Sequence, residues 1–298
     1  MQNILRGYAF LILTILTLEK CMNLKKKCSG SPYNEKYNIT VQLIELSLNK
    51  MKIGKSPGFD NITTEHVVHS HPVIFTILAK LFNSMLCTGY VPQDFGRGIT
   101  IPIPKNEKVQ GPQLIDTFRG ISLSPMLSKL FEHCLLKQFS KFFITSYNQL
   151  GFKPKSGCQH AIYTVRKVVE FYITNSSPVN LCCLDISKGF DKVNHSVLFL
   201  KLMKRGAPEV LINLLCYWYS ISYNCVRWEN ILSRPYQLLA GIRQGGVLSP
   251  VLFSIYVNDL LDKFAKSGCY FKGIPLSAIM YADDIILLSP SICELQNC

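Results

Sequence analysis

From residue 39 onward, the chain alternates between apolar positions at helical spacing and shorter apolar runs at strand spacing. Val41, Ile44 and Leu48 recur at intervals of three and four residues, which predicts a helix. The same spacing, together with prolines and polar caps at the starts, predicts further helices. They cover residues 72–89, 125–143, 160–174, 194–205, 208–219 and 249–264.

Three other segments have the pattern of strands. Residues 99–103 alternate, and their prolines indicate an edge position in a sheet. Residues 179–186 form an apolar run typical of a buried strand, with Asp185 near its end. Two short apolar runs between residues 279 and 288 flank Asp283 and Asp284, which predicts a hairpin with a two-residue connection. Because helices and strands mix without regular βαβ alternation, the predicted fold class is α+β.

Composition narrows the class of protein. Hydrophobic residues make up 48% of the chain, which excludes a mostly disordered protein. Lys and Arg total 32 against 19 Asp and Glu, and the net charge of +13 is spread over both halves. This balance fits a polyanionic partner, nucleic acid first, with a solvated basic surface as the alternative. The 12 cysteines contain no C-x-x-C spacing, so neither a zinc site nor a disulfide scaffold is predicted.

The N-terminal residues have a composition of their own. Residues 8–18 form an apolar run behind Arg6, shorter than the roughly 20 residues of a membrane-spanning helix. The length suits the core of a signal peptide, but Glu19 and Lys20 follow where small residues would precede cleavage. We therefore predict an apolar leader and polar linker over residues 1–38 and no signal peptide. A secreted or membrane-anchored protein stays the alternative.

Three carboxylates lie at the ends of apolar strands: Asp185, Asp283 and Asp284. Asp-Asp is also favourable turn chemistry, so a purely structural role is the alternative. If the fold brings all three together, their repulsion requires a cation, and hard divalent ions prefer oxygen ligands. Two such ions can activate an attacking hydroxyl and stabilise a leaving phosphate oxygen. This chemistry would also use basic groups to bind a triphosphate.

The residues around these carboxylates resemble the sequence boxes of reverse transcriptases. Residues 281–284 (YADD) resemble Y-x-D-D, residues 185–193 (DISKGFDKV) resemble D-x-x-K-A-F-D-x-V, and residues 240–253 (AGIRQGGVLSPVLF) resemble G-x-x-Q-G-x-x-L-S-P-x-L-F. Upstream, residues 55–60, 118–123 and 151–157 resemble K-A-P-G-P-D, Y-R-P-I-S-L and G-F-R-x-G. All six occur in the family's order, which is typical of non-LTR, LINE-like retrotransposons. Group II intron maturases and bacterial retroelement enzymes are narrower rivals.

The resemblance implies a right-hand polymerase fold with fingers, a palm built on an antiparallel sheet, and no thumb. Residues 39–85 would form a helical N-terminal extension of the fingers. Residues 86–298 would form the reverse transcriptase domain, truncated after the YADD hairpin.

The resemblance also implies roles for individual residues. Asp185, Asp283 and Asp284 would be catalytic, and with the backbone carbonyl of Ile186 they would bind two Mg²⁺ ions, with Mn²⁺ as a substitute. Five further residues would bind the nucleotide. Lys105 and Arg119 would hold the triphosphate, Phe190 would exclude a ribose 2′-hydroxyl, and Gln244 with Gly245 would contact the nucleotide.

The function implied is RNA-directed DNA polymerisation, with an RNA template, a DNA primer and dNTPs as partners and no stable membrane partner. The alternative is a catalytically inactive, truncated remnant that only binds nucleic acid. The family expectation for location is the nucleus or the cytoplasm, and the sequence does not choose between them. The oligomeric state is also open.

Overall fold

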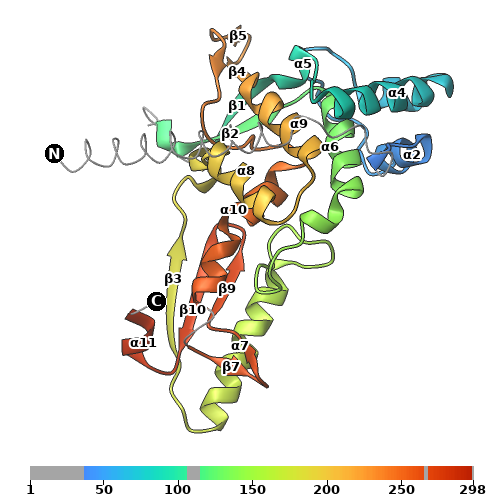
Figure 1. Cartoon of the computed structure of the whole chain (residues 1–298). Coiled ribbons are helices and arrows are strands. Elements are labelled where there is room, and N and C mark those ends of the chain that lie inside the picture. The colour runs from blue at the N-terminus through green and yellow to red at the C-terminus, as the bar shows by residue number, and fades with distance from the viewer. Residues whose placement is uncertain (1–36, 106–114, 265–267, 297–298) are drawn as a thin grey trace. The chain divides into compact units, whose positions relative to one another are not determined.

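The structure is a computed structural model, and it describes residues 37–105, 115–264 and 268–296 (Figure 1). The chain divides into two compact units, each assembled from two separate stretches. The N-terminal unit combines the residues up to Phe142 with Val193–Ser249, and the C-terminal unit combines Phe143–Lys192 with the residues from Pro250 onward. Both units mix helices and strands. The predicted leader lies outside the described residues except for residues 37 and 38, and the predicted domain start at residue 86 stays a prediction.

The N-terminal unit contains a five-stranded sheet in the order β2-β1-β4-β5, with β6 also paired to β4. The strands are β1 (Arg97–Pro104), β2 (Phe118–Leu123), β4 (Tyr223–Trp228), β5 (Ile231–Leu232) and β6 (Tyr236–Gln237). The prediction that β1 is an edge strand was wrong, since β2 pairs with it on one side and β4 on the other. Its prolines are tolerated because β4 pairs only with residues 97–100, which leaves Pro102 and Pro104 beyond that ladder.

Helices and short 3₁₀ turns complete the N-terminal unit (Figure 1). They are α2 (Val41–Leu48), α3 (Thr64–Val68), α4 (Val73–Thr88), α5 (Gln93–Gly96), η2 (Ile115–Thr117), α6 (Met126–Gln138), η3 (Ser140–Phe142), α8 (His195–Lys204) and α9 (Glu209–Ser220). Side-chain caps begin two of them, because Thr40 accepts from the N–H of Leu43 at 3.2 Å and Asn194 from that of Val197 at 3.1 Å. The helices predicted in this unit are confirmed.

The core of the N-terminal unit is aromatic. Phe131 lies 4.7 Å from Phe82 and 5.7 Å from Trp218, measured between ring centroids. Both phenylalanines are fully buried, and the indole N–H of Trp218 donates to the carbonyl of Phe95 at 3.0 Å. Burying these rings stabilises the unit, and the hydrogen bond to Phe95 pairs the one polar atom that they carry.

The C-terminal unit is built on a three-stranded antiparallel sheet in the order β3-β10-β9. The strands are β3 (Asn180–Asp185), β9 (Ala278–Tyr281) and β10 (Asp284–Ser289), with a separate pair β7 (Tyr270–Phe271) and β8 (Ile274–Pro275). The helical elements are α7 (Cys158–Thr174), η4 (Gly189–Lys192), α10 (Ser249–Phe264) and α11 (Ile292–Gln296). Apolar residues of α7, of the sheet and of the segment before β7 share one core, formed by Ala161, Val168, Cys269, Ile279 and Leu288.

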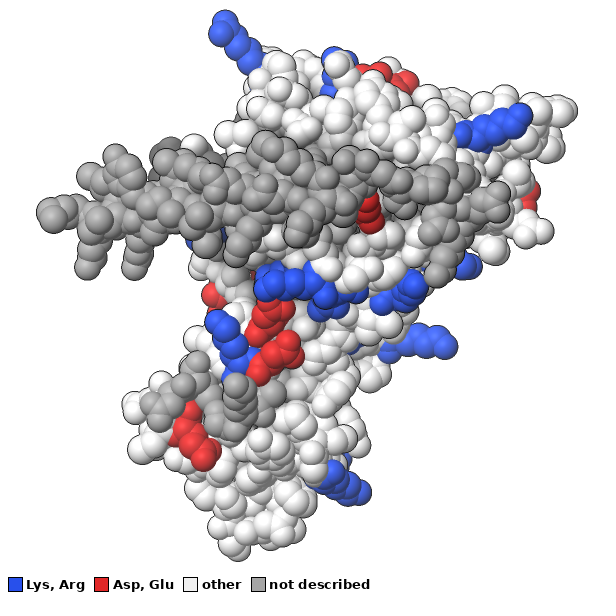
Figure 2. All heavy atoms as spheres, viewed as in Figure 1, with Lys and Arg blue, Asp and Glu red and all other residues white. Residues whose placement is uncertain are grey.

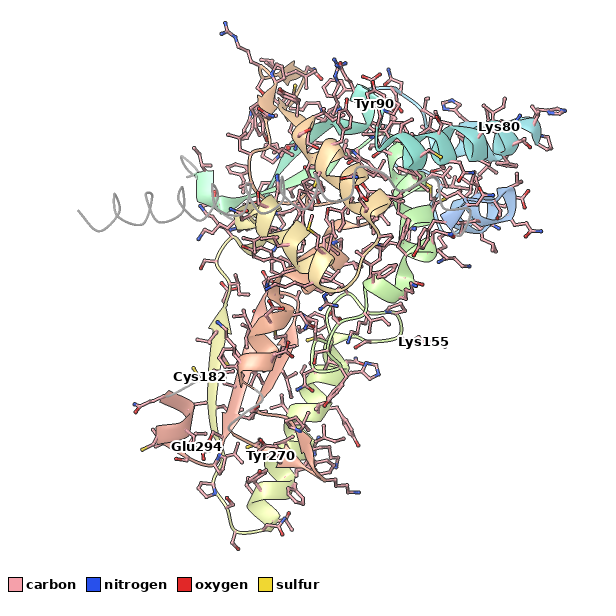
Figure 3. All side chains as sticks on the ribbon, viewed as in Figure 1. Lys80, Tyr90, Lys155, Cys182, Tyr270 and Glu294 are labelled. Carbon is pink, nitrogen blue, oxygen red and sulfur yellow. The ribbon has the colours of Figure 1, made fainter. Side chains whose placement is uncertain are left out.

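Strand β3 differs from its prediction as a buried strand. Among the described strands it pairs only with β10, and Leu181 and Leu184 are 49% and 43% exposed. Figure 3 shows Cys182 on this strand and Glu294 on the neighbouring helix α11. The apolar run predicts a strand correctly, but it does not encode whether another element covers that strand.

The surface is mixed in charge. On the face drawn in Figure 2, Lys and Arg side chains and Asp and Glu side chains are both visible among uncharged residues. Within the described ranges, no helix has the length and apolar content needed to cross a bilayer.

Candidate active site

The tip of the β9–β10 hairpin carries the predicted acidic pair, with the turn shifted by one residue. Tyr281 pairs with Asp284, so Ala282 and Asp283 form the two-residue loop and Asp284 begins β10. The predicted loop of Asp283 and Asp284 was therefore wrong. The reason is that Ala282 adopts a left-handed backbone (φ +60°), the conformation that tight hairpin loops need at their first position. Alanine rarely adopts it, so the residue type did not indicate it.

The neighbouring strand brings the third carboxylate to the same place. Asp185, the last residue of β3, lies directly opposite Asp284 in the antiparallel ladder, and opposed residues project from one face of a sheet. The N–H of Ile186 donates to the carbonyl of Asp283 at 3.1 Å, which ties the loop to β3. Asp185 and Asp284 are exposed and Asp283 is half-buried. The three predicted carboxylates therefore gather at one end of one sheet.

These carboxylates fit a hard divalent cation that takes some of its ligands from the protein and the others from a substrate. Mg²⁺ in phosphoryl-transfer sites is bound by one or two carboxylates plus substrate phosphates, rather than by a complete cage of side chains. In the described part of the chain, no group of three or more His, Cys, Asp or Glu side chains is arranged to hold a metal ion. The carbonyl of Ile186 accepts from the N–H of Gly189 at 3.0 Å and retains a second lone pair.

Phe190 lies on η4, five residues after Asp185, and two other rings hold it in place. It stacks on Phe253 of α10, with centroids 4.5 Å apart and planes 15° apart, and it meets Phe152 edge-on at 5.9 Å. The ring is half-buried, so one part of it stays accessible. Two aromatic contacts of this kind restrict the rotation of the side chain.

The remaining predicted residues lie in the N-terminal unit. Arg119 is exposed on β2, and Lys105 follows the partner strand β1, where its N–H donates to the carbonyl of Thr117 at 2.8 Å. Two basic residues therefore lie on one hairpin. At the other end of β2, the N–H of Ser122 donates to the carbonyl of Gln244 at 2.6 Å.

Gly245 allows this close approach. Its φ is +116°, and a Cβ there would lie 2.6 Å from the carbonyl oxygen of Ser122. A side chain is therefore excluded both by the backbone conformation and by the neighbouring strand. The structure places Gln244 and Gly245 beside the strand that carries Arg119.

A buried polar network, which sequence reasoning missed, supports the loop that contains Gln244. One oxygen of Glu132 accepts from the N–H groups of Val247 and Leu248 at 2.5 and 2.8 Å. Arg243, the residue before Gln244, also points inward. It donates to the carbonyl of Gly96 at 3.0 Å and to the hydroxyl of Ser222 at 2.9 Å. The available signal for Glu132 was that it is the one acidic residue of α6, directly after the apolar Phe131.

Glu132 should make stability depend on pH. Its burial raises the pKa of the carboxyl above 4.5, although the two N–H donors and Arg243 oppose the rise. A raised folded-state pKa contributes stability below the unfolded value and loses it as pH rises through the folded value. We therefore expect the free energy of unfolding of the wild-type protein, measured relative to Glu132→Gln, to decline as pH rises above 4.5. Urea unfolding of both proteins from pH 4 to pH 7 measures this, and parallel curves would contradict it.

Comparison with known proteins decides the family. Residues 103–298, most of the chain, match the family model described as reverse transcriptase (RNA-dependent DNA polymerase). The chain belongs to the reverse transcriptase family. The resemblance read from the six boxes is thereby confirmed, and the carboxylate turn lies within the matched residues.

The curated proteins that this chain resembles are related to the reverse transcriptases of non-LTR retrotransposons. The chain is 28% identical over 266 residues to the RNA-directed DNA polymerase from mobile element jockey of Drosophila funebris, covering 87% of this chain and 28% of that protein. It is 25% identical over 253 residues to the R2DM Pol polyprotein of Drosophila melanogaster, covering 85% and 23%. The chain thus spans about a quarter of the length of the relatives that it matches.

Solved structures with a similar backbone include apo telomerase from Candida tropicalis. The TM-score is 0.45 at 14% sequence identity, covering 76% of this chain and 50% of the telomerase chain. A partial Cas6-RT-Cas1–Cas2 complex gives a TM-score of 0.39 at 16% identity. Similarity at this level does not assign the fold, so the family rests on the sequence match.

Proposed function

We propose that this chain is the RNA-directed DNA polymerase part of a non-LTR retrotransposon protein, and that it joins dNTPs to a primer 3′-hydroxyl. The observation that carries the proposal is the register of β3 on β10, which sets Asp185 opposite Asp284 beside the loop residue Asp283. Membership of the family and the order of the sequence boxes support the same reaction.

The carboxylates would hold the metal ions. Asp185 and Asp283 would bind two Mg²⁺ ions, assisted by Asp284 and by the carbonyl of Ile186. When bound, the ions supply charge for deprotonating the primer hydroxyl and for stabilising the leaving pyrophosphate. The chain positions its carboxylates by backbone pairing, so their geometry is set before substrate arrives.

The N-terminal unit would bind the incoming nucleotide. Arg119 and Lys105 would contact the triphosphate, Arg with two parallel hydrogen bonds and Lys as a point charge. Gln244 and Gly245 would contact the base or sugar from the neighbouring loop. In this proposal the β1–β2 hairpin belongs to the fingers, and the antiparallel sheet of the C-terminal unit is the palm. The net charge of +13 supports an RNA template and a DNA primer as partners.

Phe190 would select deoxynucleotides by excluding a 2′-hydroxyl. We expect Phe190→Val to raise the incorporation of ribonucleotides relative to deoxynucleotides by about 10- to 100-fold, because a steric barrier is removed. The measurement is the ratio of kcat/KM for dTTP and UTP on one template. Leu81→Val, a change at an exposed residue of α4, is the control. An unchanged ratio in Phe190→Val would contradict the role.

The activity is tested by primer extension on poly(rA)/oligo(dT) with Mg²⁺. Wild-type protein is compared with the double variant Asp283→Asn plus Asp284→Asn. Incorporation of dTTP by the wild type and its loss in the double variant are the expected results. If soluble, folded protein incorporates nothing but still binds RNA in a salt-dependent manner, the chain is a binder without catalysis and the proposal fails.

A further inference from the structure

We propose that Gln149 is a positioning residue whose buried side chain holds the backbone of the carboxylate loop in the conformation that presents Asp283. The inference rests on the proposed function, because it assigns a purpose to a contact with the metal-binding loop. Gln149 is fully buried, at 0% exposure, and it lies outside the six boxes that the sequence revealed.

The side-chain amide of Gln149 contacts both backbone polar groups of one loop residue. Its Oε1 accepts from the N–H of Ala282 at 3.3 Å, and its Nε2 donates to the carbonyl of Ala282 at 3.4 Å. The same Oε1 accepts from the N–H of Gly151 at 2.9 Å. A buried amide must find partners, and here the amide is joined to the loop that carries the catalytic carboxylate.

Backbone pairing brings Gln149 to that place. The N–H of Leu150 donates to the carbonyl of Met280 at 2.8 Å, and the N–H of Met280 donates to the carbonyl of Asn148 at 2.9 Å. Residues 148–150 therefore run parallel to β9 along its outer edge, opposite to the side that β10 occupies. Met280 lies two residues before Ala282, so a side chain as long as glutamine reaches the loop.

The loop needs such support because of its backbone. Ala282 has a φ of +60°, and a residue with a Cβ persists there only when its surroundings enforce it. The bond from Ile186 to the carbonyl of Asp283 fixes one side of the loop, and Gln149 fixes the other. Without the amide, the N–H and the carbonyl of Ala282 lose these partners, and the loop is free to relax. Asp283 would then move with it.

A role in simple core filling predicts a different behaviour. Methionine is unbranched and close to glutamine in length and volume, so Gln149→Met preserves the packing and removes only the hydrogen bonds. The neighbouring Asn148 offers a matched control. Its Nδ2 donates to the carbonyl of Pro275 at 3.0 Å, a contact of similar sequence separation that does not involve the loop.

The first test measures hydrogen exchange at the Ala282 amide and does not depend on activity. We expect Gln149→Met to accelerate this exchange by about tenfold or more, with the amides of β10 unchanged, because only the loop opens locally. Asn148→Leu should leave Ala282 as in the wild type. If Ala282 in Gln149→Met exchanges at the wild-type rate, the inference is overturned. It is also overturned if Asn148→Leu accelerates this exchange equally.

The second test is kinetic. We expect Gln149→Met to lower kcat for dTTP incorporation by about tenfold and to leave KM for dTTP within about twofold, because the nucleotide contacts are intact. Adding Ala282→Gly should restore most of kcat, since glycine adopts a positive φ without support. Rescue of this kind separates positioning from packing. A variant with unchanged kcat, or with no rescue by glycine, would overturn the inference.

The two tests separate this inference from the proposed function. If the wild-type protein incorporates no nucleotide, the proposed function fails, whereas the exchange rate of Ala282 still decides whether Gln149 holds the loop. If Gln149→Met does not fold, Gln149→Leu takes its place, because it also fills the site with an apolar side chain and removes both hydrogen-bonding atoms. We expect faster exchange at Ala282 in that variant as well, and a wild-type rate would overturn the inference.

Discussion

Replacing Asp185 by Asn is expected to lower the rate of Mg²⁺-dependent nucleotide incorporation by about 10³-fold or more, which corresponds to roughly 4 kcal/mol of transition-state stabilisation. Asp185 ends β3 directly opposite Asp284, and its side chain is exposed. It could therefore bind an ion that the substrate also contacts. The amide that replaces it keeps the size of the side chain but removes its charge. The fold should be unaffected, because an exposed edge position has little packing to lose.

The measurement is single-turnover primer extension at several Mg²⁺ concentrations, with thermal unfolding recorded for every variant. Asp262→Asn is the matched control, because Asp262 is an exposed carboxylate on α10, away from the carboxylate turn in sequence. The control should extend primers at the wild-type rate. If Asp185→Asn also does so, Asp185 does not bind the catalytic ions and the assignment of the site is wrong.

Gly151→Ala is expected to displace the carboxylate loop and to lower kcat about 10²-fold, because a misplacement near 1 Å has this effect on an aligned site. A Cβ on Gly151 would overlap the backbone nitrogen of Ala282 and would lie 2.9 Å from its Cα and 3.1 Å from Oε1 of Gln149. Backbone atoms cannot rotate away as the end of a side chain can. We therefore also expect a loss of about 2–3 kcal/mol in the free energy of unfolding, as for other overpacked sites.

The same substitution at Gly157 provides the control. A Cβ there would meet only the Nδ1 of His160, at 4.0 Å, so Gly157→Ala should leave both kcat and stability close to the wild-type values. Urea unfolding and primer extension of the two variants measure the effect. Equal behaviour of Gly151→Ala and Gly157→Ala would show that the close approach of Gly151 to the loop does not matter.

Sequence spacing was a good guide to the helices and to the residue types at the site. The apolar intervals in residues 41–48 and the caps at residues 194 and 249 are local signals, and the elements that they predict are present. The boxes around Asp185 and Asp283 likewise marked the carboxylates that the sheet gathers. Such signals involve neighbours in the chain, which is why they can be read without the fold.

Most of the errors concern partners distant in sequence; the shifted β9–β10 turn is the exception, because it depends on the backbone conformation of Ala282 itself. The apolar run of β3 does not reveal that β10 is its one partner among the described strands, and the prolines of β1 do not reveal how far β4 pairs with it. Gln149 and Glu132 were missed because their roles depend on backbone groups more than a hundred residues away, at Ala282 and Leu248. A hydrophobic pattern indicates which residues turn inward and not which polar groups they meet there.

The central claim, RNA-directed DNA synthesis at this carboxylate site, is tested most directly on an RNA template of mixed sequence. The wild-type chain is incubated with an annealed DNA primer, all four dNTPs and Mg²⁺, and the product is sequenced. We predict a DNA product complementary to the RNA, formed with Mg²⁺ and absent with EDTA. Failure of folded protein to extend the primer, or addition of nucleotides unrelated to the template, would contradict the account.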